Sequence, residues 1–272
     1  MLYLFCSHSH FRNRKLFLIC AITKMASDII TSFELDKTVN SSNVIVIKEI
    51  NRCDSSFISS CFLGHCIKNK FAVLLVSTNN SLEHYHNVGL KMNYNLQKSI
   101  TSGMIDFYDA GEEFVNVILK EENISPEEFW IRINEKITKL HEKYGGVNVI
   151  FEGVSHLFDV KFTLKEVNEL CKKMIDLIRN YNSSFLAFHC NIASDGDVTN
   201  ILANSLCHKS QIVAEVENLP SGLSADVTGR ITMKYLYYKY EIEHFYTLEP
   251  KQSQYLFRLF DRGVKLLAPG TV

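Results

Sequence analysis

The sequence predicts an α/β domain in which a mostly parallel, helix-flanked sheet is continued by antiparallel strands. Three observations predict this fold class. Apolar, β-branched runs alternate with amphipathic segments of helical spacing from residue 43 onward. The segments between the early runs are long enough to hold a helix, which a parallel crossover requires. After about residue 210 the runs follow one another through short turns, which is typical of antiparallel pairing.

The early runs are apolar without polar alternation. Such runs suit strands that are covered by helices on both faces of a sheet. The run at 104–109 is weaker because it contains two aspartates. We expect strands at residues 43–48, 71–76, 104–109, 147–151 and 184–190.

Two of the helices between these strands carry clear start signals. At Ser125, a serine cap is followed by proline and then by Glu128, and Gly145-Gly146 ends the helix. Thr163 and Glu166 have the spacing of a capping box. The apolar stripe of this second helix is expected in the core: Leu164, Val167, Leu170, Cys171, Met174, Leu177, Ile178 and Tyr181.

The C-terminal part of the chain has strand-like runs joined by turn residues. We expect strands within residues 211–219, 230–242 and 254–270, with hairpin-type turns at Asp226–Gly229 and Asp261–Gly263. A parallel sheet continued by antiparallel strands is a RecA-like arrangement, the fold of NTPases with a phosphate-binding loop. The sequence therefore predicts a RecA-like domain.

One domain accounts for most of the chain. No internal repeat or low-complexity linker divides residues 40–272, so we expect a single RecA-like domain there. Residues 1–39 are expected to form an N-terminal extension that is poorly ordered at least to residue 24. The sequence restarts at Met25-Ala-Ser, a credible initiation context, and we expect residues 1–24 to be dispensable for the fold.

Composition narrows the class of protein. The net charge of −1 and the pI near 6.8 give no general attraction for nucleic acid. The longest apolar runs, such as 71–76, fall far short of the roughly 20 residues of a membrane-spanning helix. The cysteines form no C-x-x-C pair and are expected to be reduced. They are Cys6, Cys20, Cys53, Cys61, Cys66, Cys171, Cys190 and Cys207.

The loop after the first strand lacks the chemistry of a phosphate-binding loop. Such a loop uses glycines for close backbone approach and a lysine to neutralise the phosphates. No glycine occurs between Val44 and Leu63, and Asp54 stands before Ser55 and Ser56 where the lysine is wanted. The cations Lys48 and Arg52 precede that position. We therefore expect a degenerate loop with no bound nucleotide, cofactor or metal.

A second acid could accompany a loop of this kind. Glu152 ends the fourth strand, where hydrolases of this class usually carry an aspartate that holds magnesium. Without the loop, the alternative is a strand-end carboxylate near solvent. The sequence leaves open a nucleotide-binding or nucleotide-hydrolysing protein with an unorthodox loop.

Other candidate sites are weak. His65-Cys66 and His189-Cys190 pair a thiol with an imidazole, but neighbours on a strand point to opposite faces, which argues against the second pair. No other nucleophile motif or metal-binding spacing is present in the sequence. Arg258, Arg262 and Lys265 form a C-terminal cationic cluster that is a candidate RNA patch, or a set of solvated strand residues. We assign no catalytic, cofactor-binding or metal residues.

Two segments, together with the chain end DRGVKLLAPGTV, resemble a known family. Glu83–Asn93 contains an H-Y-x-x-V-G-x-K element, and Asn204–Val213 leads into the element at Leu219–Ile231 that contains D-V-x-G-x-I. Together they resemble subunit six of the Elongator complex over roughly residues 40–272.

The resemblance implies a function that the residues alone do not. Members of that family are non-catalytic RecA-like subunits, pseudo-ATPases in which the phosphate loop does not work. With Elongator subunits four and five they form a heterohexameric ring that binds tRNA and supports modification of the wobble uridine. The implied partners are those subunits, the remaining Elongator subunits and tRNA, and the implied location is the cytoplasm and nucleus.

Overall fold

The computed structural model describes residues 28–35, 43–219, 222, 226–236 and 251–268. The strands in these residues form one sheet in the order β3-β2-β4-β5-β1-β6-β7-β8-β9. Pairing is parallel from β3 through β6 and antiparallel from β6 through β9. The strands are β1 (Asn43–Ile50), β2 (Val73–Ser77), β3 (Ile105–Asp109), β4 (Asn148–Glu152), β5 (Phe185–Asn191), β6 (Ile212–Asn218), β7 (Gly229–Tyr235), β8 (Lys251–Phe260) and β9 (Gly263–Leu267).

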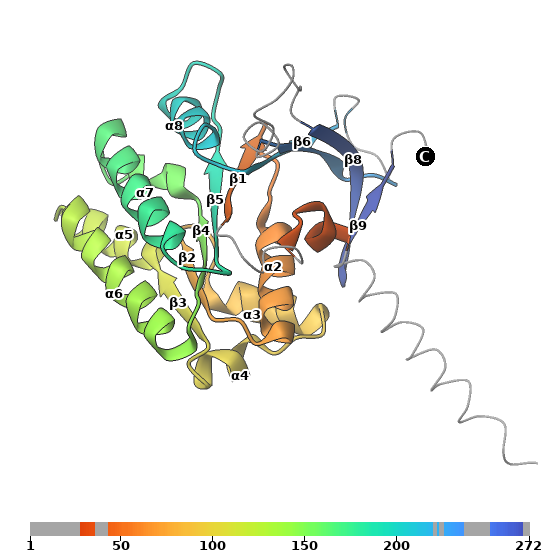
Figure 1. Ribbon diagram of the computed structural model, residues 1–272. Coiled ribbons are helices and arrows are strands. Elements are labelled where there is room, and N and C mark those ends of the chain that lie inside the picture. Colours follow the sequence, from red (N-terminus) through yellow and green to blue (C-terminus); the bar gives the residue numbers. More distant parts are fainter. Residues whose placement is uncertain (1–27, 36–42, 220–221, 223–225, 237–250, 269–272) are drawn as a thin grey trace, which may run out of the picture.

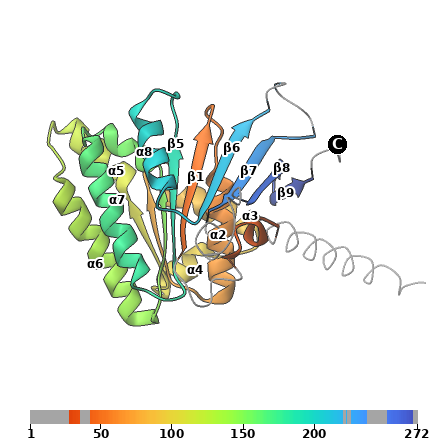
Figure 2. The same cartoon turned by 45° about the horizontal axis from the view of Figure 1, so that its top comes forward.

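Helices cover both faces of the parallel part of the sheet (Figures 1 and 2). One face carries α5, α6, α7 and α8, and the other carries α2, α3 and α4. The helices are α2 (Ser56–Asn69), α3 (Leu82–Lys91), α4 (Leu96–Thr101), α5 (Ala110–Leu119), α6 (Pro126–Tyr144), α7 (Leu164–Arg179) and α8 (Val198–Cys207), with a 3-10 helix at Val154–Phe158. The predicted RecA-like fold class and its five parallel strands are confirmed.

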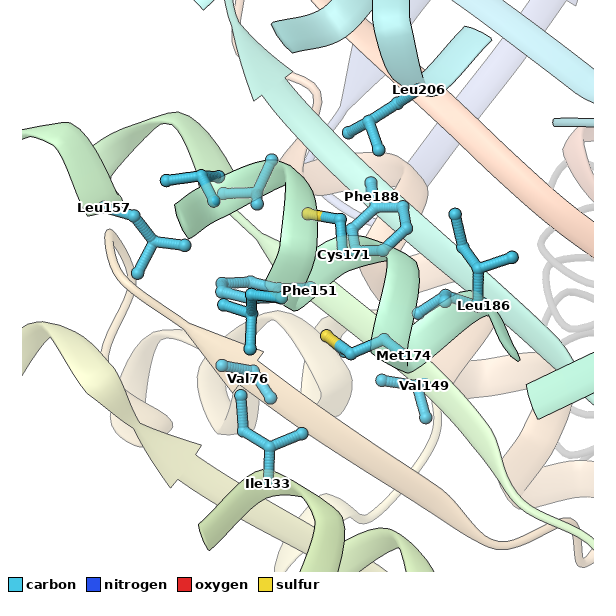
Figure 3. Packing of buried hydrophobic residues seen from close by; sticks show 14 of the residues in the cluster. Val76, Ile133, Val149, Phe151, Leu157, Cys171, Met174, Leu186, Phe188 and Leu206 are labelled. Atoms are coloured by element: carbon cyan, nitrogen blue, oxygen red, sulfur yellow. The ribbon is translucent and has the colours of Figure 1, made fainter. Parts of the chain in front are cut away.

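Strand alternation divides the core into two layers. Val44 and Val46 of β1 point into the layer under α6 and α7, whereas Ile45 and Ile47 point into the layer under α2. Figure 3 shows the first layer, where Phe151 and Phe188 of neighbouring strands lie beside Met174 of α7. Both faces of β1 are buried, which explains why its sequence is apolar without alternation.

The helix termini confirm one cap and correct another. Thr163 and Glu166 make both hydrogen bonds of the capping box at the start of α7. Gly145 ends α6 in the left-handed conformation, as the sequence predicts. Ser125 does stand at the N-cap of α6, but its hydroxyl makes no capping hydrogen bond. There, proline in the first turn fixes the helix start by its backbone angle.

The first predicted hairpin turn is wrong. In the β6–β7 pair, Asn218 lies opposite Gly229, so the connection spans residues 219–228 and Asp226–Gly229 only enters β7. The second turn is confirmed, because Phe260 pairs with Gly263 at the tip of the β8–β9 hairpin. Of the strand expected at 230–242, the structure describes residues to 236, and β7 ends at Tyr235.

A short N-terminal segment packs on the sheet. Residues 28–32 are helical, and Ile29 and Phe33 are fully buried. The Phe33 ring meets the edge of Phe62 on α2 at 4.9 Å, and the Tyr235 hydroxyl donates to the Ser32 carbonyl at 2.7 Å. The packed part of the chain therefore begins before residue 40, inside the expected extension. Residues 1–27 and the chain end 269–272 lie outside the described residues.

Candidate functional site

The loop between β1 and α2 follows β1, the central strand of the sheet, at that strand's carboxyl end. In open α/β sheets, ligands bind at the carboxyl ends of the strands. The loop turns without glycine, because Asn51 and Arg52 adopt left-handed backbone angles with φ of 55° and 58°. The chain therefore keeps the strand-to-helix turn of a phosphate-binding fold while its residues differ.

The amides at the start of α2 are bound by the chain's own carboxylates. The Ser56 amide and hydroxyl both donate to Asp54, each at 2.8 Å. The Ser55 amide and hydroxyl donate to Oε1 of Glu49, at 3.0 and 2.6 Å. A helix N-terminus is a ready anion site, and here two carboxylates already fill it. A phosphate approaching these amides would meet like charge from Glu49 and Asp54.

The two cations near the loop, Lys48 and Arg52, make no contact with the amides at the start of α2. Lys48 is buried, and its Nζ donates to Oδ1 of Asn204 at 2.9 Å and lies 3.6 Å from Glu215. Those partners stand on α8 and β6, so the lysine is held away from the start of α2. Arg52 is exposed and makes no ion pair within the described residues. Neither cation lies beside the amides at the start of α2.

A buried chain of hydrogen bonds runs under α2 from Glu49 to Glu152. The Ser55 hydroxyl contacts both Glu49 and Nδ1 of His189, the latter at 2.6 Å. Nε2 of the same imidazole lies 3.0 Å from the Ser59 hydroxyl, which lies 3.3 Å from Oε1 of Glu152. His189 is fully buried on β5. Two carboxylates on β1 and β4 are thus linked through a serine, a histidine and a second serine.

Glu152 is not near solvent, so that sequence alternative is wrong. Its side chain is 1% exposed, and its Oε2 accepts hydrogen bonds from Tyr85, Asn80 and Ser77. Burial raises the pKa of Glu152 from its usual value of 4.5 to about 7. Neutral donors of the chain surround the carboxyl oxygens of Glu152, which stands where a hydrolase of this class carries its magnesium-binding aspartate. No cluster of metal-ligating side chains is present in the described part of the chain.

Counting hydrogens shows that the buried chain holds one extra proton. The four contacts between Glu49, Ser55, His189, Ser59 and Glu152 each need one hydrogen. Two serine hydroxyls and a neutral imidazole supply three. Burial lowers the pKa of His189 to about 3, so the imidazole does not carry the fourth. A carboxyl group does, since burial raises the pKa of both Glu49 and Glu152, the latter to about 7.

The two thiol–imidazole pairs are not working sites. Cys190 faces the α7 layer, whereas His189 faces α2, as strand alternation predicts. Cys66 is fully buried in the α2 layer, and burial raises the pKa of its thiol. Neither thiol meets a base that would activate it. The cysteines within the described residues are free: Cys53, Cys61, Cys66, Cys171, Cys190 and Cys207.

The C-terminal cations lie together at the far edge of the sheet. Arg258 on β8 is the register partner of Lys265 on β9, and Arg262 occupies the turn between them. Arg258 binds Asp226 at 3.2 Å and lies over the Phe260 ring. Arg262 and Lys265 are exposed and make no ion pair within the described residues. The structure thus brings the three predicted cations together on one hairpin.

The two family-like segments supply structural contacts that sequence reasoning missed. Tyr85 on α3 is the donor that reaches Glu152. Gly89, one turn later, leaves room for the Tyr94 ring, which a Cβ at Gly89 would meet at 2.6 Å. Gly229 on β7 lies under the Phe257 ring at 2.8 Å from the same construction. The resemblance was the signal for all three residues, since Tyr85 and Gly89 belong to the element at 83–93 and Gly229 belongs to the element at 219–231.

The fold and the loop define a class: a RecA-like domain whose phosphate loop is filled by its own side chains. A KaiC-like protein from the archaeon Pyrococcus horikoshii has a similar structure, with a TM-score of 0.57 and 7% identity over 82% of this chain and 88% of that one. At this identity the likeness shows the fold alone. Among the described residues, no helix is long and apolar enough to cross a membrane.

Sequence comparison gives the family. The model of the family Elongation complex protein 6 matches residues 28–259, so the chain belongs to that family. Elongator complex protein 6 of Drosophila melanogaster is 24% identical over 233 residues, which cover 83% of this chain and 90% of that protein. The match begins at the buried segment at residue 28. The resemblance inferred from the two segments is thereby confirmed.

Proposed function

We propose that this chain is a non-catalytic, structural subunit of the Elongator complex. The observation that carries the proposal is the start of α2, where the amides of Ser55 and Ser56 bind Glu49 and Asp54. A subunit that hydrolysed nucleotide would need those amides free. Family membership supports the assembly, since the Drosophila relative is named as a protein of the Elongator complex.

The proposed assembly is a heterohexameric ring of RecA-like subunits with Elongator subunits four and five. The ring binds tRNA and supports modification of the wobble uridine, and it works with the remaining Elongator subunits in the cytoplasm and nucleus. The near-neutral net charge of −1 is consistent with RNA binding by the assembly rather than by one chain. A ring combines weak patches from several subunits, which raises the overall affinity.

Affinity purification from cells followed by native mass measurement tests the assembly. We expect two copies of this chain with two copies each of subunits four and five. Depletion of the chain is expected to lower carboxymethyl-type modification of the uridine at the first anticodon position. A monomeric chain in cell extract, together with unchanged wobble uridines, would contradict the proposal.

The alternative function is nucleotide binding or hydrolysis through an unorthodox loop. It requires the Glu49 and Asp54 carboxylates to leave the α2 amides so that a phosphate can bind there. Lys48, which could neutralise such a phosphate, is held by Asn204 instead. Calorimetry of the purified chain with magnesium and ATP or GTP separates the two functions. We expect no measurable binding. Low-micromolar binding that is lost on changing Ser55 and Ser56 would favour the alternative.

A further inference from the structure

A second concave region lies at the other end of α2. A cavity of about 940 Å³ opens between the C-terminal turn of α2, the connection from α3 to α4, and the residues that lead into β3. The 14 residues of α2 separate it from the β1–α2 loop by about 20 Å at the usual helical rise. Its size falls within the range of sites for small molecules. The buried chain of hydrogen bonds does not extend to it.

Cations converge on this cavity without acids. Lys68 and Lys70 reach it from the end of α2, and Lys98 reaches it from α4. No aspartate or glutamate is among its described lining residues. Nor do these three lysines make an ion pair within the described part of the chain. A fourth, Lys143 of α6, donates to the carbonyl of Ser102, which also lines the cavity.

Part of this arrangement has a local explanation. Lys68 lies in the last turn of α2 and Lys70 caps it, and cations there are favoured by the helix dipole. Lys98 and Lys143 lie in the last turns of α4 and α6, where the dipoles of those helices favour a cation in the same way, so the local explanation covers each lysine by itself but not their gathering around one cavity. Like charges that converge without a counter-charge repel one another, and a bound anion removes that repulsion. The cavity therefore has the charge of a site for a multiply charged anion.

The cavity also has a fixed wall. Met92 of the family-like segment and Tyr94 directly after it line the cavity, together with Met104 before β3. The Tyr94 ring is fixed between two helices, because Cβ atoms at Gly64 of α2 and Gly89 of α3 would contact its two edges at 3.0 and 2.6 Å. The wall is thus set by packing rather than by a loop. A rigid wall beside several cations lowers the ordering cost of binding a ligand.

We propose that this cavity is a binding site for a ligand that carries several phosphate groups. The ligand's source is either a free polyphosphate or the backbone of an RNA strand, since both present closely spaced phosphates to lysines. The site is independent of the filled loop, and it does not depend on the proposed ring. Its cations are Lys68, Lys70 and Lys98.

The test uses the full chain with two probes, tripolyphosphate and a short fluorescent single-stranded RNA. Anisotropy reports RNA binding, and calorimetry reports tripolyphosphate binding. The double variant K68E/K98E is expected to weaken binding of the active probe by about tenfold or more and to reduce its salt dependence. Tripolyphosphate that displaces RNA would place both in one site, whereas binding of a single probe identifies the source.

The matched control is K139E/K172E, which changes the net charge equally. Lys139 on α6 and Lys172 on α7 are exposed, belong to helices on the other face of the sheet, and make no ion pair within the described residues. The control is expected to keep wild-type affinity, and K68R/K98R is expected to retain most of it. Thermal unfolding checks that each variant is folded. Failure of both probes to bind, or equal losses in K68E/K98E and K139E/K172E, would overturn the proposal.

Discussion

The two ends of α2 differ in how the chain treats anions. At the N-terminal end, where RecA-like proteins bind phosphate, Glu49 and Asp54 occupy the amides and no described cation faces them. At the C-terminal end, lysines surround an open cavity that contains no acid among its described lining residues. The helix dipole alone would place an anion at the first end. Side chains have reversed that preference, so the charge pattern, and not the fold, decides where a ligand binds.

The two ends also differ in burial. The N-terminal end rests on buried polar groups, of which Glu152 and His189 are almost fully enclosed. Such groups stabilise a fold only when each is hydrogen-bonded, and removing one partner leaves the others unsatisfied. The lysines at the C-terminal end are exposed and are not needed for packing. Substitutions should therefore affect stability at the first end and binding at the second.

The largest expected effect is that of Glu152→Ala. The change leaves the buried Tyr85 hydroxyl and the half-buried Asn80 amide without their acceptor and opens a cavity. We expect the free energy of unfolding to fall by about 3 kcal/mol in urea denaturation, from the desolvation of two donors. The control Tyr85→Phe removes one donor of that group and should cost about 1 kcal/mol. Equal costs for the two variants would show that Glu152 is not the centre of the network.

The pH dependence of stability sharpens the same point. Because the pKa of Glu152 is raised from 4.5 to about 7, the folded protein binds the proton more tightly than the unfolded chain does. Its contribution to stability is full below about pH 4.5 and is lost as the pH rises to about 7, by about 2–3 kcal/mol. The pKa of His189 is lowered to about 3, so its contribution has the opposite sign and grows between about pH 3 and 6.5.

Glu152→Gln separates the two contributions. Glutamine is similar in shape to the protonated carboxyl and does not titrate. Relative to the wild type, this variant should gain stability as the pH rises from about 4.5 to 7, because the other buried groups titrate alike in both proteins. Urea denaturation at a series of pH values measures the difference. A constant offset across that range would contradict proton binding by Glu152.

A smaller effect is expected at the Tyr94 wall of the cavity at the C-terminal end of α2. Gly89→Ala places a methyl group 2.6 Å from the Tyr94 ring, which is fixed on its other side by Gly64. Overpacking of this kind should lower the free energy of unfolding by about 2 kcal/mol. The matched control is Gly196→Ala, where a Cβ meets no atom within 4 Å. If Gly89→Ala costs no more than that control, the Tyr94 wall is not rigid.

The sequence determines much of this fold and little of the site. Continuous apolar runs located the parallel strands, because burial on both faces leaves a one-dimensional signal. The same holds for the capping box at Thr163. The hairpin turn predicted at Asp226–Gly229 was wrong. Its turn residues belong to a longer connection, and the register between two strands is not encoded in a short stretch of sequence. The helix end predicted at Gly145 was correct, because a left-handed helix terminus depends on the glycine itself and not on distant residues.

The filled loop was visible only as missing chemistry. The sequence shows an acid in place of glycine and lysine, but it does not show which amides that acid binds. The sequence offered His189 only as the neighbour of Cys190 and did not single out Glu49, because their roles depend on β1 and β5 meeting under α2. In the sequence, Glu152 is recognisable only as the last residue of a strand. Its burial depends on α2 and α3, whose residues Ser59 and Tyr85 contact it. Networks that join distant parts of a chain are the portion that sequence patterns do not reveal.

The smallest expected effect tests whether the first end can be made to resemble the second. Asp54 is exposed, and Asp54→Asn removes its charge while keeping an oxygen that accepts from Ser56. The loss of a charged cap should cost about 0.5–1 kcal/mol in urea denaturation. Phosphate binding should still be absent, because the Glu49 carboxylate keeps the Ser55 amide from a ligand. Calorimetry with tripolyphosphate checks this in the K68E/K98E background, where the cavity is disabled. Binding that appears only with Asp54→Asn would show that this one carboxylate, rather than the buried network, closes the start of α2 to anions.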